Sequence, residues 1–199
     1  MTEQFERLAI DGGAPVRSTP LPGNTRAMGQ DEIDELTEVI HSGQPGRHGG
    51  TKVKELERAF AERYGAKHAI AVSSGSAADH TAIAMIDPEP GDEIITTPCT
   101  DFGGILGILF QNAIPVFADL DPQSFCLDPV SVEACITPRT RAILATHLFG
   151  GLADIDALKA IGDRHGIPVI EDCAQAQLAE LADGRLAGTI GQIGCFSLN

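Results

Sequence analysis

Hydrophobic and polar residues recur with two different periods along this chain, and the period changes near residue 65. Before that point, apolar residues return every three or four positions in 31–43 and 51–65, which predicts two amphipathic helices. Each of these segments ends in a glycine, a residue typical of a helix C-terminus. Residues 1–30 are rich in Gly, Pro and Thr and show no period, so we expect an extended N-terminal arm there. We expect one large domain over residues 31–199.

Beyond residue 67, short β-type runs alternate with helical runs. This alternation predicts a mostly parallel, doubly wound α/β sheet covered by helices. The run 167–172 is apolar over most of its length, as expected for a strand with helices on both faces. The predicted strands are 68–72, 92–97, 114–120, 141–148, 167–172 and a last one near 193–198, and the predicted helices between them are 77–86, 104–112, 129–136 and 154–166.

Composition narrows the classes of protein that are possible. The chain has 199 residues, 43% of them apolar, and a formal net charge of −14. Such an acidic chain lacks the basic surface that nucleic acids and anionic membranes require, and we interpret the acidity as an aid to solubility. The five cysteines include no C-x-x-C pair, so we expect neither a disulfide framework nor a metal site. No signal peptide and no run as long as a membrane span are seen, and we expect a cytoplasmic protein.

Ligands of parallel α/β sheets bind beyond the carboxyl ends of the strands, so the residues that follow each predicted strand are the candidates for a site. The segment "SSGSAA" follows the run 68–72 and precedes a helix. Gly75 there permits close approach of a ligand and Ser76 could add a hydroxyl donor, an arrangement that suits a phosphate. An ordinary helix N-cap is the alternative. The segment matches neither the P-loop pattern nor G-x-G-x-x-G.

Two further strand ends carry candidate ligand-binding residues. Phe102 follows the run 92–97 and could stack on a flat ligand, or it could be a core aromatic residue. Asp172 ends the run 167–172, where it could cap the next turn or meet a cationic atom of a ligand, and Gln175 lies within reach of the same place. A phosphate site, a stacking ring and a carboxylate together suit pyridoxal 5′-phosphate (PLP), whose ring nitrogen must stay protonated.

Other polar residues at strand ends favour structural roles. We expect His147 to be a core histidine whose hydrogen bonds are satisfied, and Asp119 and Asp121 to form a turn. Glu171 is expected to be a solvated or capping carboxylate.

The sequence resembles the DegT/DnrJ/EryC1/StrS family of PLP-dependent sugar aminotransferases, which have the fold of type I aminotransferases. The resemblance runs from residue 12 to the last residue and rests on the order and spacing of several segments, which are "GGAPVR", "FAERYGAKHAIAVSSGSAA", "PEPGDEIITTP", "IPVFADLDP", "ITPRTRAI", "HLFGGLADIDALKAI", "GIPVIEDCAQA" and "GTIGQIGCFS".

The resemblance implies PLP as the cofactor and gives six residues a role. Asp172 corresponds to the catalytic aspartate that pairs with the pyridine nitrogen. The other residues that it implies bind the cofactor are Gly75 and Ser76 at the phosphate, Phe102 stacked on the ring, Gln175 near the ring hydroxyl, and Ser197 at the phosphate. Ser197 is identified by the resemblance alone.

This sequence departs from the family pattern at two places near the expected cofactor. Asp101 stands where the family usually has a threonine, and Gln177-Leu178-Ala179 stands where it usually has His-Gly-Ala. These differences leave the substrate open.

In the family, the lysine that bonds covalently to PLP follows the position of Ser197 by about five residues, which is beyond Asn199. We therefore expect the chain to be an N-terminal fragment that has part of the large domain and lacks the small C-terminal domain. On its own it is expected to bind PLP weakly and not to catalyse transamination.

The resemblance implies that the parent enzyme is a homodimer that moves an amino group from glutamate or glutamine to a keto sugar, in particular a nucleotide-linked one, or to a cyclitol ketone. One alternative is a sugar dehydratase of the same fold that uses PLP or its amine form, with histidine in place of the lysine. Another alternative is a truncated product without enzymatic activity.

Overall fold

The computed structural model describes residues 7–19 and 28–198. They form two units, and the boundary between the units in the sequence lies between Gly50 and Thr51. The first unit contains a short 3-10 turn (Ala9–Asp11) and helix α1 (Gln30–Ser42), which ends at Gly43 in the left-handed conformation. Helix α1 confirms the helix predicted over 31–43. The remainder of the predicted arm, residues 1–6 and 20–27, lies outside the described residues.

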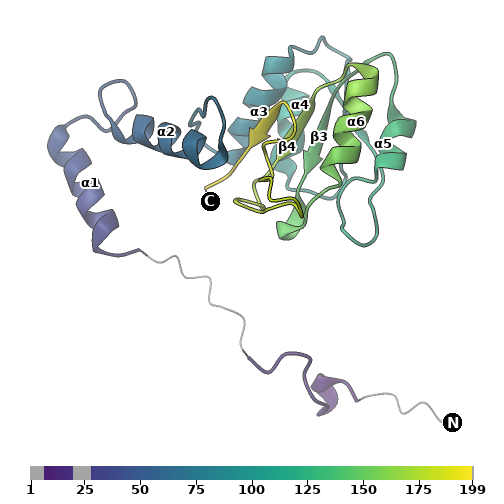
Figure 1. Ribbon diagram of the computed structural model, residues 1–199, viewed down its shortest axis with the longest axis horizontal. Helices are drawn as coiled ribbons and strands as arrows, with labels where there is room; N and C mark the ends of the chain where they lie inside the picture. The colour runs from purple at the N-terminus through teal and green to yellow at the C-terminus, as the bar shows by residue number, and fades with distance from the viewer. Residues whose placement is uncertain (1–6, 20–27, 199) are drawn as a thin grey trace. The chain divides into compact units, whose positions relative to one another are not determined.

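The second unit is built around one sheet of five parallel strands (Figure 1). The strand order is β2-β1-β3-β4-β5, and every neighbouring pair is parallel. The predicted parallel α/β sheet is thereby confirmed. The bounds of the strands are β1 (Glu93–Thr96), β2 (Ile114–Phe117), β3 (Thr140–Thr146), β4 (Val169–Asp172) and β5 (Ile193–Cys195).

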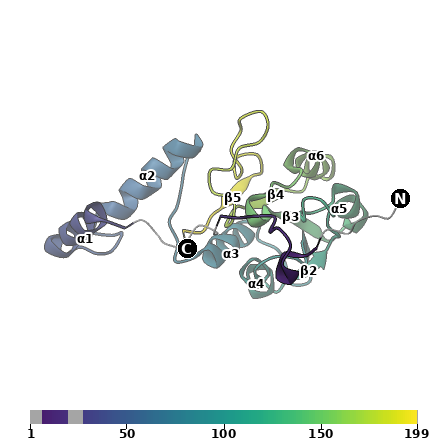
Figure 2. The same cartoon turned by 90° about the horizontal axis from the view of Figure 1, so that it is seen from below.

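Helices cover both faces of this sheet, and Figure 2 shows α3 and α4 on one face and α5 and α6 on the other. Neighbouring residues of each strand point to opposite faces, so each strand contributes to two hydrophobic cores. Ile94, Leu144 and Ile170 pack in the core below α3 and α4, while Ile95, Ile143 and Val169 pack in the core below α5 and α6. The helices of this unit are α2 (Lys52–Tyr64), α3 (Gly75–Ile86), α4 (Phe102–Phe110), α5 (Pro129–Cys135) and α6 (Ile155–His165).

The order of the strands reverses between β1 and β3. The chain passes from β1 outward to β2, then returns across β1 to form β3, β4 and β5 in turn. In open α/β sheets, the crevice at such a reversal lies at the carboxyl ends of the strands and is where ligands bind. The residues that follow β1, β3, β4 and β5 therefore define the region in which a site is expected.

The strand predicted over residues 68–72 is wrong, because this segment belongs to no β-ladder among the described residues. Ile70 is 73% exposed and Val72 is 41% exposed. The Ala71 N–H donates instead to the Glu57 carboxylate on α2, at 3.0 Å. An apolar run can form a strand only where a neighbouring strand accepts its backbone hydrogen bonds, and no described strand lies beside this one.

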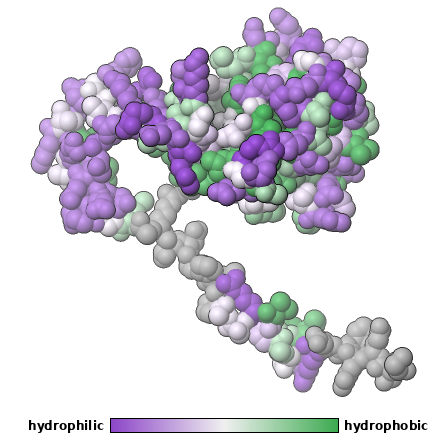
Figure 3. Space-filling model, in the orientation of Figure 1, coloured by the Kyte–Doolittle hydropathy of each residue, from purple (hydrophilic) through white to green (hydrophobic). Residues whose placement is uncertain are grey.

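Apolar side chains are also visible on the outside of the α/β unit, whereas hydrophilic side chains predominate on the visible face of α1 (Figure 3). No helix in the described part of the chain has the length and apolar character needed to cross a membrane.

Helices α3 and α4 approach each other closely because glycines line their contact. A Cβ atom at Gly107 would lie 2.9 Å from the His80 Cα and 3.0 Å from the His80 N, closer than real Cβ atoms come to backbone. Only glycine allows this approach without moving one of the helices. Candidate site residues lie at the N-terminal ends of both helices.

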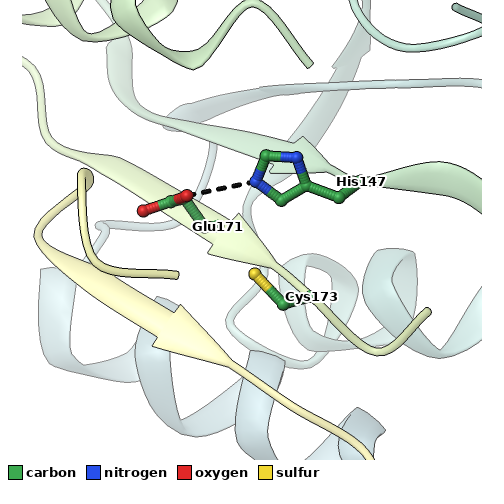
Figure 4. Close-up of side chains that lie close together, drawn as sticks. All are labelled: His147, Glu171 and Cys173. Atoms are coloured by element: carbon green, nitrogen blue, oxygen red, sulfur yellow. Dashed lines mark hydrogen bonds and ion pairs between the residues drawn. The ribbon is translucent and has the colours of Figure 1, made fainter. Parts of the chain in front are cut away.

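A fully buried acid–histidine pair ties the end of β4 to two loops (Figure 4). The Glu171 carboxylate accepts a hydrogen bond from His147 Nε2 at 3.1 Å and from the amides of Gly188, Ile190 and Gly191 at 2.8, 2.8 and 2.6 Å. His147 Nδ1 in turn accepts from the Ala153 N–H at 3.1 Å, which assigns the neutral Nε2–H tautomer to the ring.

These contacts test two predictions made from the sequence. His147 is confirmed as a core histidine whose hydrogen bonds are satisfied. The expectation that Glu171 is solvated or capping is wrong, because the side chain is fully buried and four donors replace water around it.

The Cys173 thiol lies close to this pair, with one ligand atom of each of the three residues within 4.8 Å of the others. Both ring nitrogens and both carboxylate oxygens are already used by hydrogen bonds, and burial raises the pKa of the Cys173 thiol. The cluster is therefore explained by folding alone.

Burial by itself raises the pKa of Glu171, but the hydrogen bonds from His147 and the three amides together bring the pKa below its ordinary value. A carboxyl whose pKa is lowered by folding stabilises the folded state above the pKa of the unfolded chain. This contribution is lost as the pH falls through the lowered pKa of Glu171.

We predict that Glu171→Gln lowers the free energy of unfolding by about 3–5 kcal/mol, because the amide places an N–H₂ group against backbone donors. Urea denaturation at neutral pH measures the change. The matched control is Glu89→Gln, which removes the same charge from an exposed side chain and should change stability by less than about 0.5 kcal/mol. Equal effects of the two substitutions would contradict the structural role of Glu171.

Candidate functional site

All six residues that the sequence predicts at the cofactor lie at the carboxyl-end edge of the sheet or at the helix ends beside it. The two glycine-loop residues open α3, and the aromatic residue opens α4. The acid is the last residue of β4, the glutamine follows in the next turn, and the last serine lies two residues after β5. In chain order these residues are Gly75, Ser76, Phe102, Asp172, Gln175 and Ser197.

The N-terminus of α3 presents unused backbone donors. Ser74 caps the helix by accepting from the Ala77 N–H at 3.1 Å. Among the described residues, the amides of Gly75 and Ser76 have no hydrogen-bond acceptor. Free amides at the positive end of a helix dipole favour an anion such as a phosphate.

Ser197 lies directly against this helix terminus, and Gly75 makes the contact possible. A Cβ atom at position 75 would lie 2.9 Å from the Ser197 Cβ and 3.2 Å from its Oγ. Any larger residue would push the Ser197 hydroxyl away from the amides of α3. The structure thus brings together Gly75, Ser76 and Ser197, which lie far apart in the sequence.

Phe102 is placed beside the same terminus by the start of α4. The residue is 58% exposed, which excludes the alternative of a core aromatic residue. Asp101 caps the helix by accepting from the Gly103 N–H at 2.8 Å. A Cβ atom at Gly103 would overlap the Ser76 Oγ, so α4 begins in contact with the first turn of α3. An exposed ring in this position is available to stack on a flat ligand.

Asp172 ends β4 and is 5% exposed. Its Oδ1 accepts from the Ala174 N–H at 3.0 Å, which caps the following turn, and its Oδ2 accepts from the Thr146 hydroxyl at 3.3 Å. Burial raises the pKa of Asp172, and the hydrogen bonds from Ala174 and Thr146 partly oppose this rise. The carboxylate is therefore held in one orientation with limited solvation, a state that a cationic ligand atom would stabilise.

Gln175 is oriented by a loop that follows β3. Its Oε1 accepts from the Phe149 N–H at 2.9 Å, which leaves the Nε2 amide group as a donor for a ligand. Phe149 has a φ of 55°, an unusual conformation for a large residue that costs about 1–2 kcal/mol. In this conformation the Phe149 N–H points to the Gln175 Oε1 and serves as its donor.

An aromatic cluster holds the segment that carries Ser197. The ring of Phe196 lies 5.0 Å from Phe60 and 4.7 Å from Tyr64, measured between centroids. The Tyr64 hydroxyl also accepts from the Leu178 N–H at 2.9 Å. Helix α2 therefore anchors both the exit of β5 and the turn that follows β4.

Gln177 adds a polar link between the same two segments. Its Nε2 donates to the Ala174 carbonyl at 2.8 Å and to the Ser197 carbonyl. Asp101 and Gln177, the two departures from the expected family pattern, thus each make a definite local contact.

Sequence reasoning missed Thr146 and the aromatic cluster. Thr146 directly precedes His147 at the end of β3, and its position opposite Asp172 follows from the register of β3 and β4, which pairs these two residues. The available signal was a hydroxyl residue at a strand end in the predicted parallel sheet. The cluster of Phe60, Tyr64 and Phe196 had no signal in the local pattern, because its members meet only in the folded chain.

Comparison with known proteins gives a family match over most of the chain. The model of the DegT/DnrJ/EryC1/StrS aminotransferase family matches residues 26–199. The L-glutamine:2-deoxy-scyllo-inosose aminotransferase of Streptomyces kanamyceticus is 42% identical over 203 residues, which cover 100% of this chain and 47% of that protein. The chain thus spans about half the length of the curated relatives that it matches.

Solved structures agree with this match. An aminotransferase from Psychrobacter cryohalolentis superposes with a TM-score of 0.81 at 36% identity, covering 89% of this chain and 44% of that one. NtdA from Bacillus subtilis, solved with bound cofactor PMP, gives a TM-score of 0.70 at 28% identity, covering 81% of this chain and 37% of that one.

We predict that Gln177→Ala loosens the segment around Ser197 while the fold persists. Loss of its two hydrogen bonds should lower the free energy of unfolding by about 1–2 kcal/mol. Hydrogen exchange of residues 196–198, followed by mass spectrometry, should become faster. The control Gln123→Ala alters an exposed glutamine in another loop and should leave this exchange unchanged; unaltered exchange in Gln177→Ala would contradict the link.

Proposed function

Because the chain belongs to the DegT/DnrJ/EryC1/StrS aminotransferase family, we propose that it forms the PLP-binding part of an enzyme that transfers an amino group to a ketone on a sugar or cyclitol. The observation that carries the proposal is the convergence of Gly75, Ser76, Phe102, Asp172 and Ser197 at one edge of the sheet. These residues offer anion donors, an exposed ring and an oriented carboxylate in one place.

The residues present fit PLP. The free amides of Gly75 and Ser76, together with the Ser197 hydroxyl, would hold the phosphate at the N-terminus of α3. Phe102 would stack on the pyridine ring. When bound, PLP supplies an electron sink for the carbon that carries the amino group.

Asp172 has the central electrostatic role in this proposal. Its carboxylate, oriented by Thr146 and Ala174, would keep a proton on the pyridine nitrogen through a charge-assisted hydrogen bond. Gln175 would donate from Nε2 to an oxygen on the ring, because its Oε1 is already used by Phe149. Together these contacts would hold the ring in one orientation at the sheet edge.

The chemical class of the substrates is supported by the relatives. A protein 42% identical to this chain is named an L-glutamine:2-deoxy-scyllo-inosose aminotransferase. We therefore favour L-glutamine as the amino donor and a cyclitol ketone as the acceptor, with a keto sugar as the broader class. The dehydratase has less support, because the matched family is an aminotransferase family and the relatives at 42–43% identity are named aminotransferases. The alternative of an inactive truncated product is tested by the two-polypeptide experiment below.

We further propose a homodimer that works in the cytoplasm. The five cysteines are all unpaired, which supports a reducing compartment. Several large apolar residues remain exposed on the α/β unit and would be covered in a dimer, among them Ile70, Phe110 and Phe117.

We predict that the chain binds PLP and that Asp172→Asn weakens binding by about tenfold to hundredfold, the loss expected for a hydrogen bond to a charged group. Equilibrium dialysis measures the affinity. The control Asp154→Asn removes the same charge from the N-cap of α6, where asparagine caps equally well, and should bind PLP like the parent chain.

Amino transfer is tested by adding the part of the Streptomyces kanamyceticus relative that this chain does not match, as a second polypeptide, with PLP, L-glutamine and a cyclitol ketone. Amination of the cyclitol supports the proposed reaction. PLP binding without amination of any keto cyclitol or keto sugar would overturn the substrate proposal and leave the cofactor proposal in place. PLP binding that is unaffected by Asp172→Asn would overturn the role of Asp172.

We predict that Gly75→Ala separates stability from binding. The added Cβ displaces Ser197 from α3 and should weaken PLP binding by about tenfold or more. Alanine is a better helix former than glycine by up to about 1 kcal/mol, so thermal stability should stay the same or rise. In the control Gly46→Ala, the new Cβ meets no atom within 4 Å, and binding should not change; equal binding by both variants would argue against a phosphate at this helix terminus.

A further inference from the structure

A second carboxyl group is buried beside the proposed site and has no role in the function described above. Asp79 lies on the inward face of α3 and is 4% exposed. Among the described residues, its Oδ1 has no hydrogen-bond partner. A buried carboxylate oxygen without a donor is costly, so the protonation state of this side chain requires an explanation.

Asp79 and Asp172 both lie next to the same glycine. A Cβ atom placed on Gly104 of α4 would be 3.7 Å from the Asp79 Oδ2 and 3.8 Å from the Asp172 Oδ2. The absence of a side chain at Gly104 thus leaves the two carboxyl groups facing one small space. Two carboxyl groups that share a buried space cannot both ionise without a large repulsion.

The groups that act on Asp79 offer no compensating positive charge. From β4 and the N-cap of α4 it faces the acids Asp172 and Asp101, and from β5 it faces the Cys195 thiol, with the Cys173 thiol also nearby. Neither lysine nor arginine is among the described groups that alter its ionisation. Neutralisation of this acid must therefore come from a proton.

The hydrogen bonds decide which of the two acids keeps that proton. Asp172 accepts from the Ala174 amide and the Thr146 hydroxyl, and both donors stabilise its ionised form. Asp79 has an Oδ1 without any donor, and the Cys195 thiol, a weak donor, is its one hydrogen-bond partner among the described groups that lower its pKa. The ionised form is consequently favoured at Asp172 and the protonated form at Asp79.

We infer that Asp79 holds the single proton of a buried Asp79–Asp172 pair and is a positioning residue that keeps Asp172 as the ionised member facing the ligand. The location of the proton follows from the contacts of the chain itself, while its use rests on the proposed function. A neutral Asp79 leaves the negative charge on the one carboxylate that can meet a protonated ring nitrogen.

The direction of the electrostatic effects agrees with this assignment. Burial, followed by the charge of Asp172, raises the pKa of Asp79 to about 8. A folded-state pKa above the value in the unfolded chain means that the proton stabilises the fold at low pH. This stabilisation is present below the ordinary pKa of aspartate and is lost progressively as the pH rises toward 8.

The first test locates the proton without any cofactor. Infrared spectra of the ¹³C-aspartate-labelled chain at pH 6.5 should contain the band of a protonated carboxylic acid. The band should disappear in Asp79→Asn, and it should remain in Asp87→Asn, a matched control that removes an exposed acid from the end of the same helix. A band that persists in Asp79→Asn and is lost in Asp172→Asn would overturn the assignment.

The second test uses the pH dependence of stability. Between pH 5 and pH 7, the unfolding equilibrium constant of the parent chain should rise relative to that of Asp79→Asn, toward tenfold for each pH unit, because folding retains one extra proton. Urea titrations at several pH values measure the ratio. Parallel profiles for the parent chain and Asp79→Asn would overturn the inference, since a merely structural aspartate would shift stability equally at every pH.

Should Asp79→Asn fail to fold, Asp172→Asn supplies the decisive measurement. The charge of Asp172 helps to retain the proton on Asp79, so its removal should shift the titration of the Asp79 band to lower pH. An unchanged titration would overturn the coupling of the two acids. All three measurements are made on the chain without PLP. A failure to bind PLP would refute the proposed function and leave the location of the proton on Asp79 unaffected, and a failure of the proton assignment would leave the proposed function unaffected.

Discussion

The structure depends on how two neighbouring carboxyl groups are buried at the end of β4. Glu171 and Asp172 are consecutive residues of one strand, so they point to opposite faces of the sheet. Desolvation opposes ionisation of both carboxyl groups, and the hydrogen bonds that oppose this effect differ between them. Glu171 receives a full set of donors from His147 and from the loop around residues 188–191, and it stabilises the architecture. Asp172 receives only two donors and keeps capacity for an external cation.

The face that receives Asp172 is organised by close contacts that only glycine permits. Gly75 lets Ser197 approach the N-terminus of α3, and Gly103 and Gly107 let α4 lie against the first two turns of α3. Gly104 leaves the space that Asp79 and Asp172 share. A single added methyl group at Gly75, Gly103 or Gly107 would move a helix or a ligand-facing side chain, so the packing of α3 on α4 and the shape of the site are one feature.

The sequence predicted the sheet well because strand–helix alternation is a local pattern. It failed over residues 68–72, where an apolar run has the composition of a strand without having a neighbouring strand. It also failed for Glu171, since four donors that surround a buried carboxylate come from distant loops and leave no periodic signal. Asp172 and Phe102 could be proposed as site residues from their positions after strands, whereas Ser197 was proposed from the family resemblance alone. The pairing of Asp79 with Asp172 depends on a helix–helix distance that no local pattern encodes.

The hydrogen bond between the Tyr64 hydroxyl and the Leu178 amide joins residues that are 114 positions apart, and the aromatic contact of Tyr64 with Phe196 joins residues even farther apart. Closing so long a stretch of chain carries a large entropic cost, which local helices and adjacent strands avoid. We therefore expect strands β1 to β4 and the helices between them to form early. Helix α2 and the segment after β5 are expected to dock last. On this order of events, Ser197 reaches its place at the N-terminus of α3 only at the end of folding, and an incompletely folded chain would present a sheet edge without the proposed anion site.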